Sequence, residues 1–196
     1  MRATLVSKNS HKARELAVLL PGWSVDPIAV DELPEETGTT FYENARAKAA
    51  FGREVVGAEM WTIGEDSGVE VEGLGGRPGI RSARYAGLSA TDEENVTTLL
   101  AELDGVAGPG RRARYVSELV CLSPAGEEFR GSGTLEGRIG RERRGSEGFG
   151  YDPVFIPDGE ERTVAELGDA WKAQRSHRAA AAAALLQAVG SAVPAR

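Results

Sequence analysis

Short apolar runs alternate with amphipathic helix patterns along the chain, and this alternation restricts the fold more than any other feature. Residues 3–7 form an apolar run that predicts a short buried strand. From Ser10 the chain repeats alanine and leucine at helical spacing until Pro21. A second strand is predicted over 23–30, where Pro27 indicates either the edge of a sheet or a break in the strand. Such an alternation of strands and helices is typical of α/β folds.

Later segments extend the same pattern. A threonine followed three residues later by a glutamate forms a capping box, which predicts helices starting at Thr40 with Glu43 and at Thr91 with Glu94. An alanine-rich helix is predicted near the end, over about 176–189. Strands are predicted over 61–66 and 68–73, which meet at a sharp bend, and over 114–122 and 127–139. The stretches rich in glycine and arginine are predicted loops, over 73–87 and 140–157.

The length favours one domain. A chain of 196 residues lies within the usual size of a single domain. No internal repeat and no linker composition divides it, so we expect residues 1–196 to form one mixed α/β domain whose lobes flank a cleft.

Composition excludes several classes of protein. Thirty acidic and 23 basic residues give a formal net charge of −7, whereas nucleic-acid-binding surfaces are usually basic. No segment approaches the roughly 20 apolar residues of a membrane span, and the start lacks a signal-peptide pattern. The lone Cys121 cannot form an internal disulfide, which suits a reducing compartment. Charge, hydropathy and cysteine content together lead us to expect a cytoplasmic protein that binds neither membrane nor nucleic acid. Two histidines and one cysteine are too few for a usual zinc site, so any metal would be a hard cation on carboxylates.

Lysine is scarce in this chain. There are four lysines against 19 arginines, so arginine is used wherever either cation would serve. The four positions that keep lysine are therefore enriched for sites that need a compact ammonium group.

The segment S-K-N-S-H-K lies where the first strand ends and the first helix begins. Free backbone amides at the helix N-terminus would face the same point as Ser7, Asn9 and Lys12, and this arrangement suits a phosphate group. The alternative is a hydrophilic turn with a helix cap at Ser10. The chain contains no Walker A sequence.

The segment E-E-T-G-T-T-F-Y-E-N-A-R-A-K-A places polar groups on a helix. Phe41, Asn44 and Lys48 share one helix face, and Glu36 lies in the preceding loop. A face that mixes an amide and an ammonium group is poor core material. The alternative is a solvated face on which Lys48 pairs with Glu43 or Asn44.

The segment G-E-D-S-G places Glu65 and Asp66 side by side at the end of an apolar strand. Two buried carboxylates are costly unless a cation holds them. Mg²⁺ is suited to this role because it prefers one or two carboxylates together with substrate phosphates. The alternative is a tight turn in which Asp66 accepts backbone amides.

Two later motifs suit a flat ring. G-F-G-Y-D-P places two exposed aromatic residues between glycines, and the alternative is a turn that packs Phe149 into the core. K-A-Q-R-S-H-R offers Ser176 as a helix cap, with His177 and Arg178 in the first turn. Basic side chains there oppose the helix dipole and favour an anionic or ring ligand. The alternative is a salt-bridged helix start.

In this order and spacing the motifs resemble the inosine/xanthosine triphosphate pyrophosphatases, which remove deaminated purine nucleotides. The matching motifs are S-x-N-x-x-K, E-x-G-x-T-F-x-E-N-A-x-x-K-A, (D/E)-D-S-G, G-G-x-P-G-x-x-S-A-R-Y-x-G, G-F-G-Y-D-P and K-x-x-x-S-H-R, and they span residues 5–188. The resemblance implies a homodimeric enzyme with an elongated, twisted mixed β-sheet flanked by helices. It also implies two lobes with the active-site cleft between them.

The resemblance assigns roles to individual residues. Asp66 is implied to be catalytic as the proton acceptor, and Glu36 and Asp66 to hold one Mg²⁺ per subunit, for which Mn²⁺ could substitute. The residues implied to hold the triphosphate are Ser7, Lys8, Asn9, Ser10, His11 and Lys12. The other residues expected to bind substrate are Asn44, Lys48, Ser67, Phe149, Gly150, Tyr151, Asp152, Lys172, His177 and Arg178.

The implied reaction is hydrolysis of ITP, dITP and XTP to the monophosphate and pyrophosphate. Hypoxanthine and xanthine present an acceptor at position 6, where adenine presents a donor, so donors from Lys172, His177 or Arg178 would discriminate between them. One alternative is a pyrophosphatase of broader specificity. The other is a non-catalytic nucleotide-binding protein, which would need neither metal carboxylate.

The chain departs from the family pattern at two places. Glu65 stands where the family more often has aspartate, and Trp171 and Ala173 flank Lys172 where it usually has glutamate and asparagine.

Overall fold

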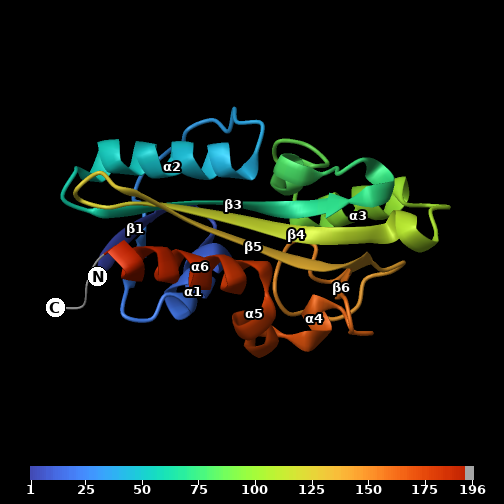
Figure 1. The fold of residues 1–196 in the computed structure, drawn as a ribbon. Helices are drawn as coiled ribbons and strands as arrows, with labels where there is room; N and C mark the ends of the chain where they lie inside the picture. Colours follow the sequence, from blue (N-terminus) through green and yellow to red (C-terminus); the bar gives the residue numbers. More distant parts are fainter. Residues whose placement is uncertain (193–196) are drawn as a thin grey trace. The chain divides into compact units, whose positions relative to one another are not determined.

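The computed structural model describes residues 1–192, whose strands form one mixed sheet in the order β2-β1-β3-β4-β5-β6 (Figure 1). The β2 end of the sheet is parallel and the β6 end is antiparallel: β1 pairs in parallel with β2 and β3, and β5 pairs antiparallel with β6. The strands are β1 (Arg2–Val6), β2 (Ser24–Pro27), β3 (Trp61–Val71), β4 (Arg112–Leu122), β5 (Glu128–Ile139) and β6 (Phe155–Pro157). The predicted mixed sheet flanked by helices is confirmed, with the Pro27 strand at its edge.

Helices flank the sheet, and most begin where the sequence predicts. They are α1 (Ser10–Leu19), α2 (Phe41–Val56), α3 (Asp92–Glu102), α4 (Val164–Leu167), α5 (Asp169–Arg175) and α6 (His177–Ala192). Thr91 and Glu94 form the complete predicted capping box of α3, whereas Thr40 alone caps α2. The predicted loops contain 3₁₀ turns, as at Gly79–Arg84. None of the helices within residues 1–192 is long and apolar enough to cross a membrane.

The bend predicted between 61–66 and 68–73 is wrong. One continuous strand, β3, runs through the G-E-D-S-G segment. Gly68 does not turn the chain there. A side chain at Gly68 would collide with the Ser82 hydroxyl and with the carbonyl of Gly79, so the glycine lets a 3₁₀ turn approach the strand closely.

The chain divides into two compact units. The first contains residues 1–66, 117–133 and the chain from 177, and the second contains 67–116 and 134–176. The boundaries fall within β3, β4 and β5 and between α5 and α6. The prediction of one domain over residues 1–196 stays a prediction, and residues 193–196 lie outside the described part of the chain.

In the first unit, helices cover both faces of the strands. Helices α1 and α6 lie on one face and α2 on the other (Figure 1). On β4, Leu119 packs in the cluster that holds α1 and α6, whereas Val120 packs against the alanines of α2. Gly64 on β3 and Gly133 on β5 permit close approach, since a side chain would strike the backbone of α2 or α6 respectively. These two glycines therefore let α2 and α6 lie close to the strands.

The second unit has its own apolar core. Val69 and Val71 of β3 are buried with apolar side chains of α3 and with aromatic residues of β4 and β6. Tyr115 and Phe155 contact each other with ring centroids 4.4 Å apart. Val96 and Leu99 of α3 and the following Leu103 are buried, and Leu100 is partly buried against the same core.

Candidate active site

The loop between β1 and α1 is ordered by its own side chains. The Asn9 carboxamide oxygen accepts from the backbone amides of His11 and Lys12 at 2.9 and 3.2 Å, so Asn9 caps α1 rather than Ser10. The Ser7 hydroxyl accepts from the Asn9 amide at 3.1 Å. A cavity of about 560 Å³ is lined by residues 7–10, by Ala13, Arg14 and Ala17 of α1, and by apolar residues between 25 and 30. The loop is therefore a preformed helix start that borders open space.

Two of the predicted phosphate residues point to local partners. Lys8 is exposed and donates to the carbonyl of Asp31, and the exposed His11 ring contacts Arg14 at 3.0 Å. Ser10 is exposed as the first residue of α1. Lys12 differs from these, because its side chain is 16% exposed and its ammonium group is ion-paired.

Asp66 lies at the centre of a buried polar cluster formed with α2. Its Oδ2 accepts from the Asn44 amide at 3.1 Å, and its Oδ1 accepts from the Lys48 ammonium at 3.0 Å. Lys48 also donates to the backbone carbonyl of Glu65 at 3.1 Å and pairs with Glu36 at 2.5 Å. The predicted face of α2 is thus buried and directed at the predicted catalytic carboxylate. The alternative pairing of Lys48 with Glu43 is wrong, since Glu43 bonds to Thr39.

The electrostatics of Asp66 and Lys48 are coupled. Burial raises the pKa of Asp66 above its usual value, and this effect exceeds the opposing influence of Lys48 and Lys12. Burial alone would lower the pKa of Lys48, but Asp66 and Glu36 together raise it. Asp66 therefore binds a proton more strongly than an exposed aspartate does, and Lys48 stays charged beside it.

The neighbouring carboxylate, Glu65, has different partners. Its Oε2 pairs with the Lys12 ammonium at 2.6 Å, and its Oε1 accepts from Nη2 and Nε of Arg178 at 3.0 and 3.2 Å. The Ser117 hydroxyl lies 3.4 Å from Oε1, and Glu15 pairs with the Nη1 of Arg178. Burial would raise the pKa of Glu65, but the Lys12 and Arg178 cations lower it well below its usual value.

Sequence reasoning missed Glu15 and Ser117 as members of this cluster. Ser117 stands in the apolar run Y-V-S-E-L-V-C-L, where a buried hydroxyl was a signal that a polar partner lies opposite. Glu15 gave no signal, because one glutamate on an amphipathic helix is ordinary. His177 is buried in the first turn of α6, and Ser67 is half-buried on β3.

A second cluster of predicted residues lies in the second unit. The Lys172 ammonium donates to Asp152 Oδ2 at 2.8 Å and lies 4.6 Å from the centre of the Phe149 ring. Asp152 also accepts from the Phe149 amide at 2.9 Å and from the hydroxyl of Tyr115 at 3.1 Å. Tyr115 was missed by sequence reasoning. The cluster places a buried ammonium group next to an aromatic ring that remains partly exposed.

The two aromatic residues of G-F-G-Y-D-P have different environments. The expectation that both are exposed is wrong for Tyr151, which is buried and donates to the carbonyl of Ser82 at 2.8 Å. Gly150 has a φ of 62° and donates its amide to Asp92 at 2.7 Å. Because the left-handed conformation at Gly150 reverses the chain, Tyr151 turns into the core while Phe149 does not.

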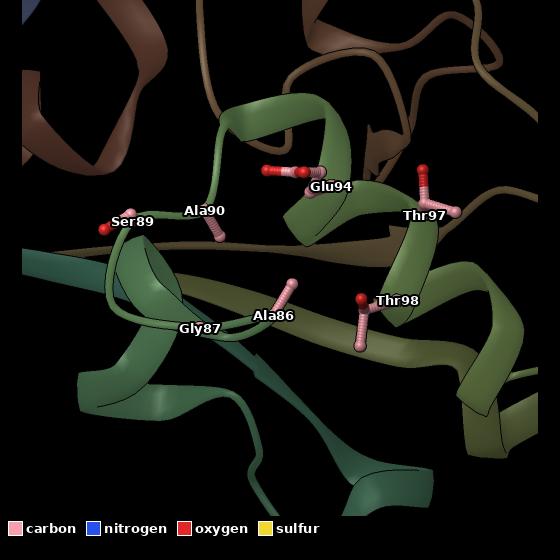
Figure 2. A pocket seen from close by; sticks show the side chains of 7 residues that line it. All are labelled: Ala86, Gly87, Ser89, Ala90, Glu94, Thr97 and Thr98. Carbon is pink, nitrogen blue, oxygen red and sulfur yellow. The ribbon is translucent and has the colours of Figure 1, made fainter.

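A separate pocket of about 500 Å³ lies in the second unit (Figure 2). Figure 2 shows small side chains of the loop 86–90 on one side and Glu94, Thr97 and Thr98 of α3 on the other. The Glu94 carboxylate already accepts from Thr91 in the capping box. None of the predicted site residues lines this pocket.

The buried and partly buried polar groups around Glu65 and Asp66 in the first unit are called the first cluster: Lys12, Glu15, Glu36, Asn44, Lys48, Glu65, Asp66, Ser117 and Arg178. Two of its carboxylates fit a hard divalent cation. Glu36 Oε1 and Asp66 Oδ1 both approach the Lys48 ammonium, so two carboxylates from different elements converge on one point of positive charge. Within residues 1–192 no group of three or more acidic, histidine or cysteine side chains could hold a metal. Two carboxylates are what Mg²⁺ takes from protein when phosphate and water supply the remaining ligands.

Comparison with protein families shows which family the chain belongs to. The model of the Ham1 family matches residues 3–188. The chain belongs to the Ham1 family. Among its Ham1-family relatives, a protein of Bdellovibrio bacteriovorus named dITP/XTP pyrophosphatase is 48% identical over 152 residues, covering 78% of this chain and 76% of that protein. One of the same name from Opitutus terrae is 43% identical, covering 95% of this chain and 98% of the relative.

Solved structures of Ham1 proteins have the same fold. The Staphylococcus aureus Ham1 protein superposes with a TM-score of 0.85 at 37% identity, covering 98% of this chain and 99% of the other. A nucleoside-triphosphatase, dITP/XTP pyrophosphatase, from Mycobacterium abscessus superposes with a TM-score of 0.72 at 34% identity, covering 99% and 98% of the two chains. The suspected family resemblance is confirmed.

Proposed function

We propose that this protein hydrolyses ITP, dITP and XTP to the monophosphate and pyrophosphate, with Mg²⁺ as cofactor. The observation that carries the proposal is the convergence of Glu36 and Asp66 on one cationic point in a buried polar cluster. The names of the bacterial relatives support the same reaction and the same substrates.

Four groups of the first unit have roles in the proposed reaction. Lys12 and the N-terminal amides of α1 bind the phosphates, and Glu36 and Asp66 hold the metal. When bound, Mg²⁺ neutralises phosphate charge and lowers the pKa of a coordinated water. Asp66 accepts the proton of the attacking water on a carboxylate oxygen. Lys12 stabilises the negative charge that develops on the phosphate oxygens.

The second cluster is proposed to recognise the base. Phe149 offers a ring face for stacking, and Lys172 donates a hydrogen bond to the acceptor at position 6 of hypoxanthine or xanthine. Asp152 holds the ammonium group in place through the 2.8 Å contact. Adenine presents a donor at position 6, which would leave the buried ammonium group without its acceptor and so disfavour ATP.

Two further properties are proposed. The family resemblance implies a homodimer. We place the enzyme in the cytoplasm, because its lone cysteine, Cys121, is buried and free, as suits a reducing compartment.

A panel of triphosphates tests the function. We expect pyrophosphate release from ITP, dITP and XTP at least roughly 100-fold faster than from ATP, lost in EDTA and restored by Mg²⁺, with Mn²⁺ as a partial substitute. Equal turnover of all triphosphates would identify a broader pyrophosphatase. Binding of ITP without turnover would identify a nucleotide-binding protein, and release of orthophosphate would contradict the proposed reaction.

A further inference from the structure

Glu65 is the most completely buried carboxylate of the first unit. It forms an ion pair with one helix and accepts hydrogen bonds from a second helix and a neighbouring strand. Its side chain is 0% exposed. Lys12 of α1 approaches one carboxylate oxygen, while Arg178 of α6 and Ser117 of β4 approach the other. One rigid strand residue therefore joins the starts of two helices that carry predicted substrate-binding residues.

Each carboxylate oxygen of Glu65 contacts a different helix. Within residues 1–192, Lys12 is the partner of Oε2, at 2.6 Å. Oε1 receives two N–H groups of the Arg178 fork, which holds the guanidinium plane. Arg178 itself is 1% exposed, so its charge depends on these carboxylate contacts.

We propose that Glu65 is a positioning residue that fixes the Lys12 ammonium for phosphate binding while it anchors Arg178 with the same carboxylate. A lysine side chain has several rotatable bonds, and ordering it upon ligand binding reduces affinity. The contact with Glu65 orders Lys12 before the ligand arrives. The inference rests on the proposed function in one respect, namely that Lys12 binds phosphate.

A purely electrostatic role for Glu65 predicts the opposite sign. If Glu65 were only a nearby negative charge, its neutralisation would tighten the binding of an anion, because repulsion would fall. If Glu65 positions Lys12, neutralisation loosens the ammonium group and weakens binding. The direction of the change in affinity therefore separates the two explanations.

The test uses inorganic tripolyphosphate as the probe, measured by calorimetry in EDTA, so that neither the base nor a metal contributes. We expect Glu65→Gln to weaken binding about threefold to tenfold, the range for losing one ordered side chain. Glu65→Asp keeps the charge, and we expect it to restore most of the affinity. In a Lys12→Met background the same Glu65→Gln change should alter affinity less than about twofold, because its effect passes through Lys12.

A matched control distinguishes positioning from general damage to the fold. Glu118 on β4 is also buried and also holds an arginine and a serine, namely Arg130 at 2.7 and 2.8 Å and Ser132 at 2.7 Å. We expect Glu118→Gln to lower the melting temperature without changing tripolyphosphate affinity. An equal loss of affinity in both glutamine variants would overturn the proposal.

A measurement on the unmodified protein keeps the proposal testable if Glu65→Gln does not fold. The chain has four lysines, so ¹⁵N spectra of the lysine ammonium groups contain few signals, and Lys12→Arg identifies the one from Lys12. We expect the Lys12 ammonium protons to exchange with water much more slowly than those of the exposed Lys8. Exchange as fast as that of Lys8 would overturn the proposal.

The remaining outcomes are also decisive. Unchanged or tighter tripolyphosphate binding by Glu65→Gln overturns the positioning role, as does an equal effect in the Lys12→Met background. If Lys12→Met alone leaves tripolyphosphate affinity unchanged, the phosphate assignment of the proposed function fails instead. The two failures are thus distinguishable.

Discussion

Glu65 and Asp66 are adjacent in sequence, yet cations from different helices compensate their carboxylates. Glu65 pairs with Lys12 of α1 and Arg178 of α6, whereas Asp66 pairs with Lys48 of α2. The cause is the strand itself, since successive side chains of β3 point to opposite faces and the helices cover both. The two carboxylates therefore cannot serve as one paired ligand, and their functions separate.

Asp66 should be essential for turnover and less important for binding. Asn at position 66 keeps the size and one oxygen but cannot accept a proton from water. We expect Asp66→Asn to lower the turnover of ITP by at least about 100-fold, as for the loss of a general base. Tripolyphosphate affinity should fall far less, because Lys12 and the amides of α1 remain.

Steady-state rates and calorimetric binding on the same preparation check this prediction. Asp26→Asn, at an exposed residue paired with Arg2, is the control and should behave as the unmodified protein. Near-normal turnover of Asp66→Asn would restrict Asp66 to a structural role and require another base.

A substitution at Arg178 should lower activity on different triphosphates by the same factor. Its Nε, Nη1 and Nη2 all contact Glu65 or Glu15, so each nitrogen of the guanidinium group is hydrogen-bonded to a carboxylate of the first unit. Lysine cannot reproduce this fork. We expect Arg178→Lys to lower kcat/KM by a similar factor for ITP and for residual ATP. A selective loss on ITP would assign Arg178 to the base, as the family resemblance alone implied.

The sequence predicted the positions of the motifs better than their partners. Helix starts at Asn9, Thr40 and Thr91 follow from short-range capping chemistry, so they could be placed within a residue or two. The contact between Glu65 and Arg178 joins residues 113 positions apart. Such a contact depends on the order of strands, which no local pattern encodes.

The sequence also contains a correct signal at Glu65 and Asp66 that a stronger local signal obscures. Strand alternation alone indicates that Glu65 and Asp66 face opposite ways, but Ser67 and Gly68 suggested a bend instead. The glycine-rich segment predicts an exposed Tyr151. Its burial depends on the carbonyl of Ser82, a partner 69 positions away that local sequence could not identify.

Arg111 should be a structural residue of the second unit. It is buried, and its guanidinium group donates to the carbonyls of Ile139 at 2.8 Å and Leu103 at 2.9 Å and to that of Gly140. We expect Arg111→Lys to lower the free energy of unfolding by about 2–3 kcal/mol, because an ammonium group cannot reach these divergent acceptors.

Thermal unfolding checks this prediction, with an expected decrease in melting temperature of roughly 5–10 °C. The exposed neighbour provides the control, since Arg112→Lys should leave the melting temperature within about 1 °C. A similar melting temperature for the two variants would mean that the carbonyl contacts contribute little.

Cys121 should not react in the folded protein. It is 0% exposed, and burial raises the pKa of its thiol to about 12. The thiolate is the reactive form, so at pH 8 nearly all of the thiol remains protonated, and reactivity would appear only as the pH approaches the raised pKa. We expect no labelling by iodoacetamide at pH 8 and complete labelling in guanidinium chloride. Rapid labelling without denaturant would indicate local opening of β4.

Lys172 should not tolerate arginine, although the charge is kept. Its side chain is 4% exposed, between the Asp152 carboxylate and the Phe149 ring. A guanidinium group is larger and planar, so it would displace the ring or break the 2.8 Å contact. We expect Lys172→Arg to raise KM for ITP about tenfold or more while tripolyphosphate affinity stays within about twofold, because the proposed function assigns the phosphates to the first cluster. Arg175→Lys, at an exposed position on the same helix, controls for exchanging the two cations and should leave KM unchanged. An unchanged KM in Lys172→Arg would show that a compact ammonium group is not required there. The scarcity of lysine in the chain would then not indicate function at this position.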